Sequence, residues 1–429
     1  MNVMTPFLVS ALLIAGSGFV SALAGDWPEF RGPENDGVAA SETAPLTWSQ
    51  KENVVWRTEL PRPGNGSPIV VADHVFLAGS EDSKGLGRSL YCFDRATGES
   101  RWTKTIDFGK AMPTHKTNPH GSSTPAADGA SKRVIVWHAS AGLFCYDFDG
   151  NEIWKRDLGE FRHMWGHGGS PIIHDGKVIL HCGPGERVFT TAIDLKDGST
   201  VWETSENFDG GNAERNRAGH YRGGWSTPIV VKFDGVDTVI CSMPTRVLGL
   251  DFATGRERWF CQGLEGKKGD LCYTSPVMGY GGLCLSLGGF GGPSIAFRVG
   301  GEGDITDSRR RWRSEKNPQS IGSGIFFDGH FYVPGAGPAN LRCLDPKDGS
   351  VKWSDPAGKG NFWGSIVRVG KRGYVINQAG TTIVFEPSPG GYKQLASNHL
   401  GESCNTTPAV ADGQIFIRTD KALYCIGKK

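Results

Sequence analysis

The sequence predicts an all-β fold, an eight-bladed β-propeller with four short strands in each blade. Two repeated signals predict it. Tryptophans recur along most of the chain at intervals of 41 to 57 residues, and a Ser/Thr-Pro dipeptide opens a strand pair upstream of most of them. A small four-stranded sheet cannot bury both of its faces alone, so repeated sheets of this kind stack radially around a channel.

The tryptophan signal is typical of a β-hairpin. In FDRATGESRW (93–102) and IDLKDGSTVW (193–202), a short strand leads into an Asp, a glycine-containing turn and a second strand. The glycine supplies the positive φ that such a turn needs. We expect a structural role in blade packing for seven tryptophans: Trp56, Trp102, Trp154, Trp202, Trp259, Trp312 and Trp353.

The Ser/Thr-Pro signal completes each unit. It is clear in SPIVVADHVFLAG (67–79) and TPAVADGQIFIRT (407–419), and weaker copies at 323–335 and 364–378 bring the count to eight. The last unit ends without a tryptophan strand, whereas NVVWRTEL (53–60) has no unit before it. We therefore expect this N-terminal strand to close the last blade, giving a propeller over residues 53–429 without open sheet edges.

The N-terminal residues 1–24 are interpreted as a cleaved signal peptide, because an apolar run precedes Ala22-Leu23-Ala24. Residues 25–52 form an N-terminal extension, and no cysteine follows the expected cleavage site to carry a lipid anchor. The rest of the chain has no apolar run long enough for a transmembrane segment. A net charge of +1, with 46 basic and 45 acidic residues, gives no indication of nucleic-acid binding. The sequence predicts a periplasmic or secreted protein, expected to be a monomer.

These motifs resemble the tryptophan-docking repeat A-x-D-x-x-x-G-x-x-x-W of the pyrroloquinoline-quinone (PQQ) alcohol dehydrogenases, over roughly residues 45 to 429. The resemblance implies a quinoprotein alcohol dehydrogenase-like propeller in which each tryptophan packs against a small residue of a neighbouring blade. The seventh unit departs from the pattern with Val384. In the other units the small residues are Cys92, Cys145, Ala192, Gly249, Ala296, Cys343 and Cys425.

Ten cysteines in an exported chain would usually indicate disulfides. Four of them occupy the small position of the repeat, and Cys182, Cys241 and Cys284 fall on expected strands. We expect these seven to be buried thiols that act as small hydrophobic side chains. A disulfide between Cys261 and Cys272 is left open by their spacing.

The loops that enter the Ser/Thr-Pro strands should meet at one mouth of the channel. We expect ligand-binding residues there, from both sides of the ring: His115, His120, His163, His167, His220, Arg222, Trp225, Tyr273, Asn361, Trp363 and Asn405, with Trp165 beside them. Three interpretations stay open, namely a hydrated channel mouth, a flat ligand stacked on Trp225 or Trp363 and held by Arg222, and a transition-metal site.

Two function classes follow from the resemblance. In PQQ dehydrogenases adjacent cysteines form a disulfide over the cofactor and a Glu/Asn/Asp set binds calcium. This sequence has no Cys-Cys pair, no C-x-x-C-H haem motif and no calcium ligands that can be aligned. No catalytic residue is assigned, and PQQ with calcium remains a candidate cofactor. The repeat also resembles the propeller lipoprotein of the outer-membrane β-barrel assembly machinery. We therefore favour a binding or scaffold protein, with an unidentified protein or small-molecule ligand, over a PQQ-dependent oxidoreductase.

Overall fold

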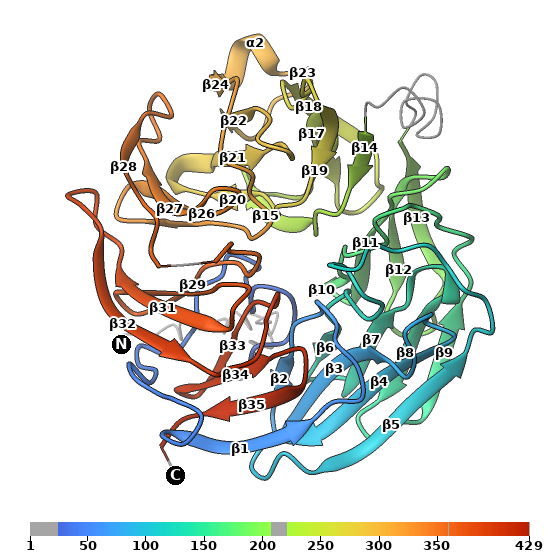
Figure 1. Cartoon of the computed structure of the whole chain (residues 1–429). Coiled ribbons are helices and arrows are strands. Elements are labelled where there is room, and N and C mark those ends of the chain that lie inside the picture. Colours follow the sequence, from blue (N-terminus) through green and yellow to red (C-terminus); the bar gives the residue numbers. More distant parts are fainter. Residues whose placement is uncertain (1–24, 207–220, 359, 429) are drawn as a thin grey trace, which may run out of the picture.

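The computed structural model of the protein describes residues 25–206, 221–358 and 360–428. Eight blades, each with four antiparallel strands, stand around a central channel (Figure 1), which confirms the predicted fold. One of the eight sheets has a short fifth strand added in parallel at its outer edge. In the described residues the only α-helix is the short α2 (Thr306–Arg309). No helix in these residues has the length and the apolar character needed to span a bilayer.

Each blade is a meander whose first strand lies nearest the channel. Blade 1 consists of β2 (Ile69–Val71), β3 (His74–Ser80), β4 (Gly87–Asp94) and β5 (Ser100–Asp107), and blade 2 of β6 (Ala126–Asp128), β7 (Arg133–Trp137), β8 (Leu143–Asp147) and β9 (Glu152–Arg156). Blade 3 consists of β10 (Ile172–His174), β11 (Lys177–Cys182), β12 (Phe189–Asp194) and β13 (Thr200–Ser205), and blade 4 of β15 (Ile229–Phe233), β16 (Val236–Ser242), β17 (Arg246–Asp251) and β18 (Glu257–Gln262). Blade 5 consists of β20 (Val277–Met278), β21 (Leu283–Leu287), β22 (Ser294–Arg298) and β24 (Arg310–Ser314), and blade 6 of β25 (Ile325–Phe327), β26 (His330–Ala336), β27 (Ala339–Leu344) and β28 (Val351–Asp355). Blade 7 consists of β29 (Val367–Val369), β30 (Arg372–Ile376), β31 (Thr381–Glu386) and β32 (Lys393–His399), and blade 8 of β33 (Ala409–Ala411), β34 (Gln414–Arg418), β35 (Ala422–Ile426) and β1 (Val54–Glu59).

The ring closes as the sequence predicts. Strand β1 pairs antiparallel with β35, and Trp56 lies opposite Cys425 in this pairing. The N-terminal strand therefore supplies the outer strand of the eighth blade, beside the C-terminal strand (Figure 1). Because β1 and β35 belong to one sheet, the eighth blade is complete only when these two distant segments of the chain pair.

The tryptophans dock each blade onto the turn of the next. The Trp56 indole lies against Gly98 of blade 1, where φ is +74° and a Cβ would overlap the ring, and its Nε1 donates to the Arg95 carbonyl oxygen at 2.8 Å. A side chain at the turn would hold the blades apart, so glycine is needed there. The same glycine contact recurs between Trp102 and Gly150, Trp154 and Gly198, Trp202 and Gly255, and Trp312 and Gly349.

One expectation about this docking is wrong. The small residue of each unit is the cross-strand partner of the tryptophan in its own blade, as Cys92 is of Trp102. The neighbouring blade contributes the glycine turn instead. Because the indole leaves its own sheet to reach that turn, only a small side chain fits underneath it, which explains the Cys, Ala and Gly at this position. In the seventh unit Val384 faces Ala396 rather than a tryptophan, so the larger side chain is tolerated.

Trp259 differs from the other docked tryptophans in its contact with the next blade. Like them it lies over the small residue of its own blade, here Gly249, where a Cβ would overlap the indole, and it is 1% exposed. Blade 5 has no glycine turn of the usual kind, because residues 299–309 there form β23 (Gly303–Asp304) and α2. Strand β23 pairs parallel with β18, opposite Trp259, and so replaces the missing docking turn.

The cores lie between blades, and all ten cysteines are buried free thiols. The interpretation of seven of them as small buried hydrophobic side chains is confirmed. No disulfide joins Cys261 and Cys272, and burial raises the pKa of both thiols to about 12.

The N-terminal extension, residues 25–52, contacts blades on different sides of the ring. Trp27 pairs with Val70 of blade 1, and Pro28 accepts a hydrogen bond from Ala127 of blade 2. Arg31 is 1% exposed and donates to the Gly324 carbonyl oxygen, at 2.8 Å, before the first strand of blade 6. Because its contacts reach blades 1, 2 and 6, this segment passes across one end of the channel.

Candidate functional site

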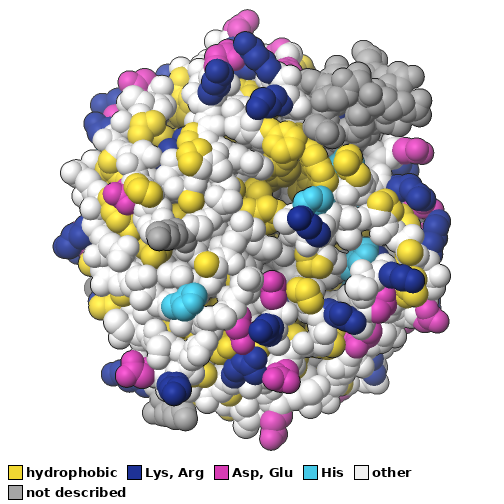
Figure 2. All heavy atoms as spheres, in the orientation of Figure 1, with side chains coloured by type: hydrophobic (Ala, Val, Ile, Leu, Met, Phe, Trp, Pro, Cys, Tyr) yellow, Lys and Arg dark blue, Asp and Glu magenta, His cyan; other side chains and the backbone are white. Residues whose placement is uncertain are grey.

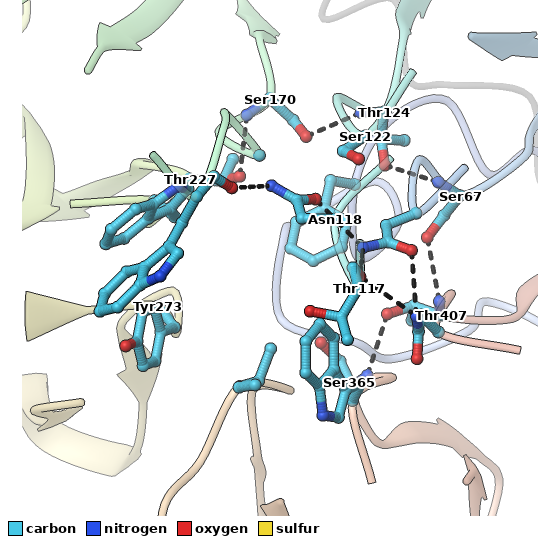
Figure 3. A pocket seen from close by; sticks show the side chains of 18 of the residues that line it. Ser67, Thr117, Asn118, Ser122, Thr124, Ser170, Thr227, Tyr273, Ser365 and Thr407 are labelled. Atoms are coloured by element: carbon cyan, nitrogen blue, oxygen red, sulfur yellow. Dashed lines mark hydrogen bonds between the residues drawn. The ribbon is translucent and has the colours of Figure 1, made fainter. Parts of the chain in front are cut away.

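A ring of hydroxyl groups encircles the channel where the Ser/Thr-Pro strands begin. In seven of the eight blades the backbone N–H of this Ser or Thr donates to the side-chain oxygen of the equivalent residue in the next blade, as Ser67 N–H does to Thr124 Oγ1 at 2.9 Å. We call this ring the hydroxyl belt; six of its residues appear in Figure 3. The links run from Ser67 to Thr124, Thr124 to Ser170, Ser170 to Thr227, Ser275 to Ser323, Ser323 to Ser365, Ser365 to Thr407 and Thr407 to Ser67.

The belt has one gap among the described residues, between Thr227 and Ser275. The Ser275 hydroxyl has no hydrogen-bond partner there. Blades 4 and 5 are joined instead by β14 (Tyr221–Gly224) and β19 (Gly269–Cys272), which pair in parallel just before the belt. The backbone N–H of Trp225 also donates to the Cys272 carbonyl oxygen at 2.8 Å.

A second ring of residues lies one step above the belt, two positions earlier in each unit. Side chains two positions apart in an extended chain face the same way, so this ring also faces the channel. Its members are Asn65, Ser122, Gly168, Trp225, Tyr273, Ile321, Trp363 and Asn405, and all of them line one cavity. We call this set the upper ring.

The cavity has a volume of about 430 Å³ and opens at one mouth of the channel. Its size lies within the roughly 300–1,000 Å³ typical of small-molecule sites. Phe30 of the N-terminal extension also lines it, so the segment that crosses the channel contributes to its wall. Figure 2 shows hydrophobic side chains gathered near the centre of this face, over β14 and β19, with most charged groups nearer the rim.

One side of the cavity is aromatic. The Trp225 ring lies 5.8 Å from Trp165 and 5.3 Å from Tyr273, measured between centroids, and Phe290 meets Trp165 edge-on at 5.2 Å. The Trp225 Nε1 donates to the Gly166 carbonyl oxygen at 2.9 Å, which fixes the orientation of its indole. Figure 3 shows indole rings on the same side of the cavity as Tyr273. These contacts join blades 3, 4 and 5 in a continuous apolar wall.

The opposite side is polar and made largely of amides. Asn118 donates to the Trp165 and His167 carbonyl oxygens at 2.7 and 2.9 Å. Asn65 donates to Asn118 Oδ1 at 3.1 Å, and Asn405 donates to Asn65 Oδ1 at 3.2 Å. Because the amide N–H groups are already engaged, this wall presents mainly carbonyl and hydroxyl oxygens to the cavity.

The structure brings together five of the residues predicted to bind a ligand. His115, Trp225, Tyr273, Trp363 and Asn405 line the cavity. Trp165, named beside them, lines it too.

The other predicted residues lie elsewhere. His120 and His167 line a separate space of about 30 Å³, and His163 is buried against the edges of Trp165 and Trp225. Burial lowers the pKa of His120 and His163 to about 4 and also lowers that of His167. These three imidazoles are therefore uncharged at neutral pH.

Of the three remaining candidates, two do not line the cavity and one lies outside the described residues. Arg222 is 2% exposed, within β14. Asn361 is half-buried, two residues before Trp363 in the sequence, and its backbone carbonyl oxygen accepts a hydrogen bond from Gln378 N–H. His220 lies outside the described residues.

The described side chains do not suit the metal and cofactor hypotheses. No group of three or more His, Cys, Asp or Glu side chains in these residues has the arrangement of a metal site. The cavity lining contains no carboxylate to hold calcium and no Lys or Arg to meet the carboxylates of PQQ. The described lining therefore does not fit PQQ with calcium.

The sequence analysis missed Asn65, Asn118, Phe30, Gln319 and Phe290, which line the cavity. Aligning the eight units on Ser or Thr and reading two residues back would have found Asn65 and the whole upper ring. Phe290 and Phe30 carry no such signal, since one lies in the glycine-rich segment 288–292 and the other comes from the extension.

Comparison with known proteins shows the family. The family model described as outer membrane protein assembly factor BamB matches residues 86–355, well over half of the chain. The chain belongs to this PQQ-repeat propeller family. A curated relative, polyvinylalcohol dehydrogenase of a Pseudomonas species, is 21% identical over 259 residues, 53% of this chain. The match covers only 38% of that dehydrogenase.

Solved structures share the propeller fold. BamB from Moraxella catarrhalis matches with a TM-score of 0.57 at 15% identity, covering 88% of this chain and 97% of that one. The quinohemoprotein alcohol dehydrogenase of Comamonas testosteroni matches with a TM-score of 0.64 at 14% identity, covering 96% and 82%. At these identities the likeness shows the fold alone, and the matched proteins are named as an assembly factor in one case and as dehydrogenases in the others.

Proposed function

We propose that this PQQ-repeat propeller is an exported binding protein whose cavity receives a small ligand or a short segment of a partner protein. The observation that carries the proposal is the upper ring. Each unit keeps a small hydroxyl residue in the belt, whereas the upper ring varies from glycine to tryptophan and lines a cavity of about 430 Å³. Aromatic and polar groups that converge in a concavity are the usual composition of a binding site.

Export rests on the sequence of residues 1–24, which lie outside the described residues. Expression of the full chain in a bacterial host, followed by fractionation and N-terminal sequencing, tests it. We expect a monomeric periplasmic product that begins at Gly25. A product that retains Met1 and stays in the cytoplasm contradicts export.

The binding role is tested by exchanging the cavity surface while the belt stays intact. Trp225→Ala with Trp363→Ala removes aromatic surface from the cavity, and the exposed Tyr280→Ala is the control. Ligands retained through purification can be identified by mass spectrometry of the denatured protein. We expect a retained ligand, or binding in a thermal-shift screen, to be lost in the double variant and kept in the control. Equal binding by both contradicts the cavity as the site.

A PQQ-dependent oxidoreductase is the second candidate, favoured by the similarity to polyvinylalcohol dehydrogenase. Incubation with PQQ and calcium, followed by gel filtration, absorption spectroscopy and metal analysis, distinguishes the two candidates. Stoichiometric PQQ and calcium with dye-linked alcohol oxidation would establish the oxidoreductase. If PQQ and calcium both separate from the protein on the column, the result supports the binding protein. This result is the one expected from a described lining without Asp, Glu, Lys or Arg.

A further inference from the structure

We infer that the cavity binds a neutral, polyhydroxylated ligand such as a short saccharide. This inference rests on the proposed binding function and names the chemistry of the ligand. It follows from the absence of charge in the described lining, the division of the cavity into two unlike walls, and the polar groups left available on the aromatic side.

The described lining of the cavity suits a neutral ligand better than a charged one. Its residues include neither Asp nor Glu, and neither Lys nor Arg. A carboxylate, phosphate or ammonium group that enters loses water and meets no Asp, Glu, Lys or Arg side chain of the described lining, and this desolvation is costly. Burial also keeps His163, directly behind the aromatic wall, uncharged, because its pKa is about 4. A neutral ligand bears no such cost.

The upper ring is divided into an apolar half and a polar half. Blades 4 to 7 contribute Trp225, Tyr273, Ile321 and Trp363, whereas blades 8, 1 and 2 contribute Asn405, Asn65 and Ser122. Blade 3 contributes Gly168, which has no side chain. A purely apolar ligand would cover the amide and hydroxyl oxygens of the second half without replacing their water, which is unfavourable. A pyranose ring matches both halves, since its C–H face stacks on aromatic rings and its hydroxyl groups hydrogen-bond to carbonyl oxygens.

The aromatic half also offers free polar groups. Among the described residues, no hydrogen bond engages Tyr273 Oη, Trp363 Nε1 or the Gln319 side-chain amide. All three residues line the cavity. Burial raises the pKa of Tyr273, so its hydroxyl keeps its proton and can donate. A hydroxylated ligand would satisfy these groups, whereas a hydrocarbon would leave them unpaired.

The N-terminal extension bears on the length of such a ligand. It crosses the channel and contributes Phe30 to the cavity. A ligand in the cavity meets this segment, which favours a small saccharide or the end of a longer one over a chain that passes through.

The test measures the binding of matched probes to the full mature chain by isothermal titration calorimetry and tryptophan fluorescence. The neutral probes are cellobiose, maltose and diacetylchitobiose. The charged counterparts are the deacetylated chitosan dimer and digalacturonate, and indole is the apolar probe. We expect at least one neutral disaccharide to bind, with the charged counterparts about tenfold weaker or more because their charge is desolvated.

Variants locate the binding. Trp363→Ala should weaken binding of the neutral disaccharide by about tenfold, because one stacking surface is lost. Tyr273→Phe removes only the free hydroxyl and should weaken it by a smaller factor, and Tyr280→Ala, an exposed aromatic outside the cavity, should change nothing. Circular dichroism confirms that each variant is folded.

The outcomes separate this inference from the proposed function. If only a charged probe or indole binds, and Trp363→Ala abolishes that binding, the cavity is a binding site but the inferred ligand class is wrong. If a disaccharide binds equally to Trp363→Ala and Tyr280→Ala, the cavity is not its site and the inference fails. If no probe binds in a way that depends on Trp363, the inference is overturned whatever else the protein binds.

Discussion

The backbone N–H of Thr407 donates a hydrogen bond of 3.0 Å to Oγ of Ser67, across 340 residues of sequence. This bond joins the eighth blade to the first at the channel, while the pairing of β1 with β35 joins the chain ends at the outer edge. The ring is therefore closed at two radii. Because the belt also forms the base of the upper ring, the contact that closes the fold also positions the cavity residues.

Removal of a belt hydroxyl should destabilise the protein. Ser67→Ala leaves the buried Thr407 N–H without its acceptor, and we expect a loss of about 1–3 kcal/mol in the free energy of unfolding. Ser275→Ala is the matched control, because this hydroxyl is buried and has no partner among the described residues. Urea unfolding of the two variants checks the prediction, and equal losses would show that the belt bond does not matter.

Close approach between inner strands gives a second prediction. A Cβ at Gly322 would overlap the Gly364 carbonyl oxygen in the neighbouring blade, and a backbone atom cannot move aside as a side chain can. Gly322→Ala should therefore lower the free energy of unfolding by about 1–3 kcal/mol through overpacking. Gly390→Ala is the control, because its Cβ would meet only Ser388 Oγ at 3.6 Å. Urea unfolding of the two variants measures the effect. Equal unfolding midpoints for Gly322→Ala and Gly390→Ala would contradict the close contact between Gly322 and Gly364.

The small position beneath each docked tryptophan gives a third. Cys92 is 0% exposed and faces Trp102 across the ladder. Cys92→Leu should displace the indole from its docking turn and cost about 1–3 kcal/mol, whereas Cys92→Ala should cost less because the space remains. Thermal unfolding with near-ultraviolet circular dichroism measures both effects. If Leu and Ala are equally harmless, the indole is not confined at this position.

The repeat made the fold predictable. Tryptophan and Ser/Thr-Pro spacing determine strand order, blade number and ring closure, because each unit must bury the same faces in the same way. It was harder to predict whether each tryptophan packs on the small residue of its own blade or on that of a neighbouring blade. The sequence shows that Cys92 and Trp102 belong to one motif, but only the structure shows that the indole reaches the next blade's glycine.

The candidate site was predicted only in part, for two physical reasons. Loop residues such as His120 and His167 were assigned to the mouth because they precede a strand, yet the structure places both around a separate small space, where they are half-buried. Regular alternation holds close to the strand, where Trp225 and Asn405 do face the cavity. Phe30 reaches the cavity from outside the repeat, and no periodic pattern could predict it.

The buried Glu29 should make stability depend on pH. Glu29 lies in the N-terminal extension that crosses the channel. Its carboxyl group accepts hydrogen bonds from the N–H of Ile173, on β10, at 2.7 Å and from Nδ2 of Asn35, in the extension itself, at 2.9 Å. Burial is the main cause that raises its pKa from 4.5 to about 8, and Glu34 adds to it. Between these two values the unfolded chain loses the proton and the folded chain keeps it. The contribution of this group is therefore fully present below about pH 4.5 and is lost as pH rises through about 8.

The Glu29→Gln variant isolates this effect, because an amide keeps the shape of the protonated acid and does not ionise. Relative to this variant, the wild-type free energy of unfolding should fall by roughly 2–4 kcal/mol from pH 4.5 to pH 8.5. Urea unfolding at intervals across that range measures the difference, with the exposed Glu52→Gln as control. The Glu52→Gln difference should stay nearly constant with pH. A constant difference for Glu29→Gln as well would mean that Glu29 is ionised in the folded protein, and that its two donors outweigh its burial.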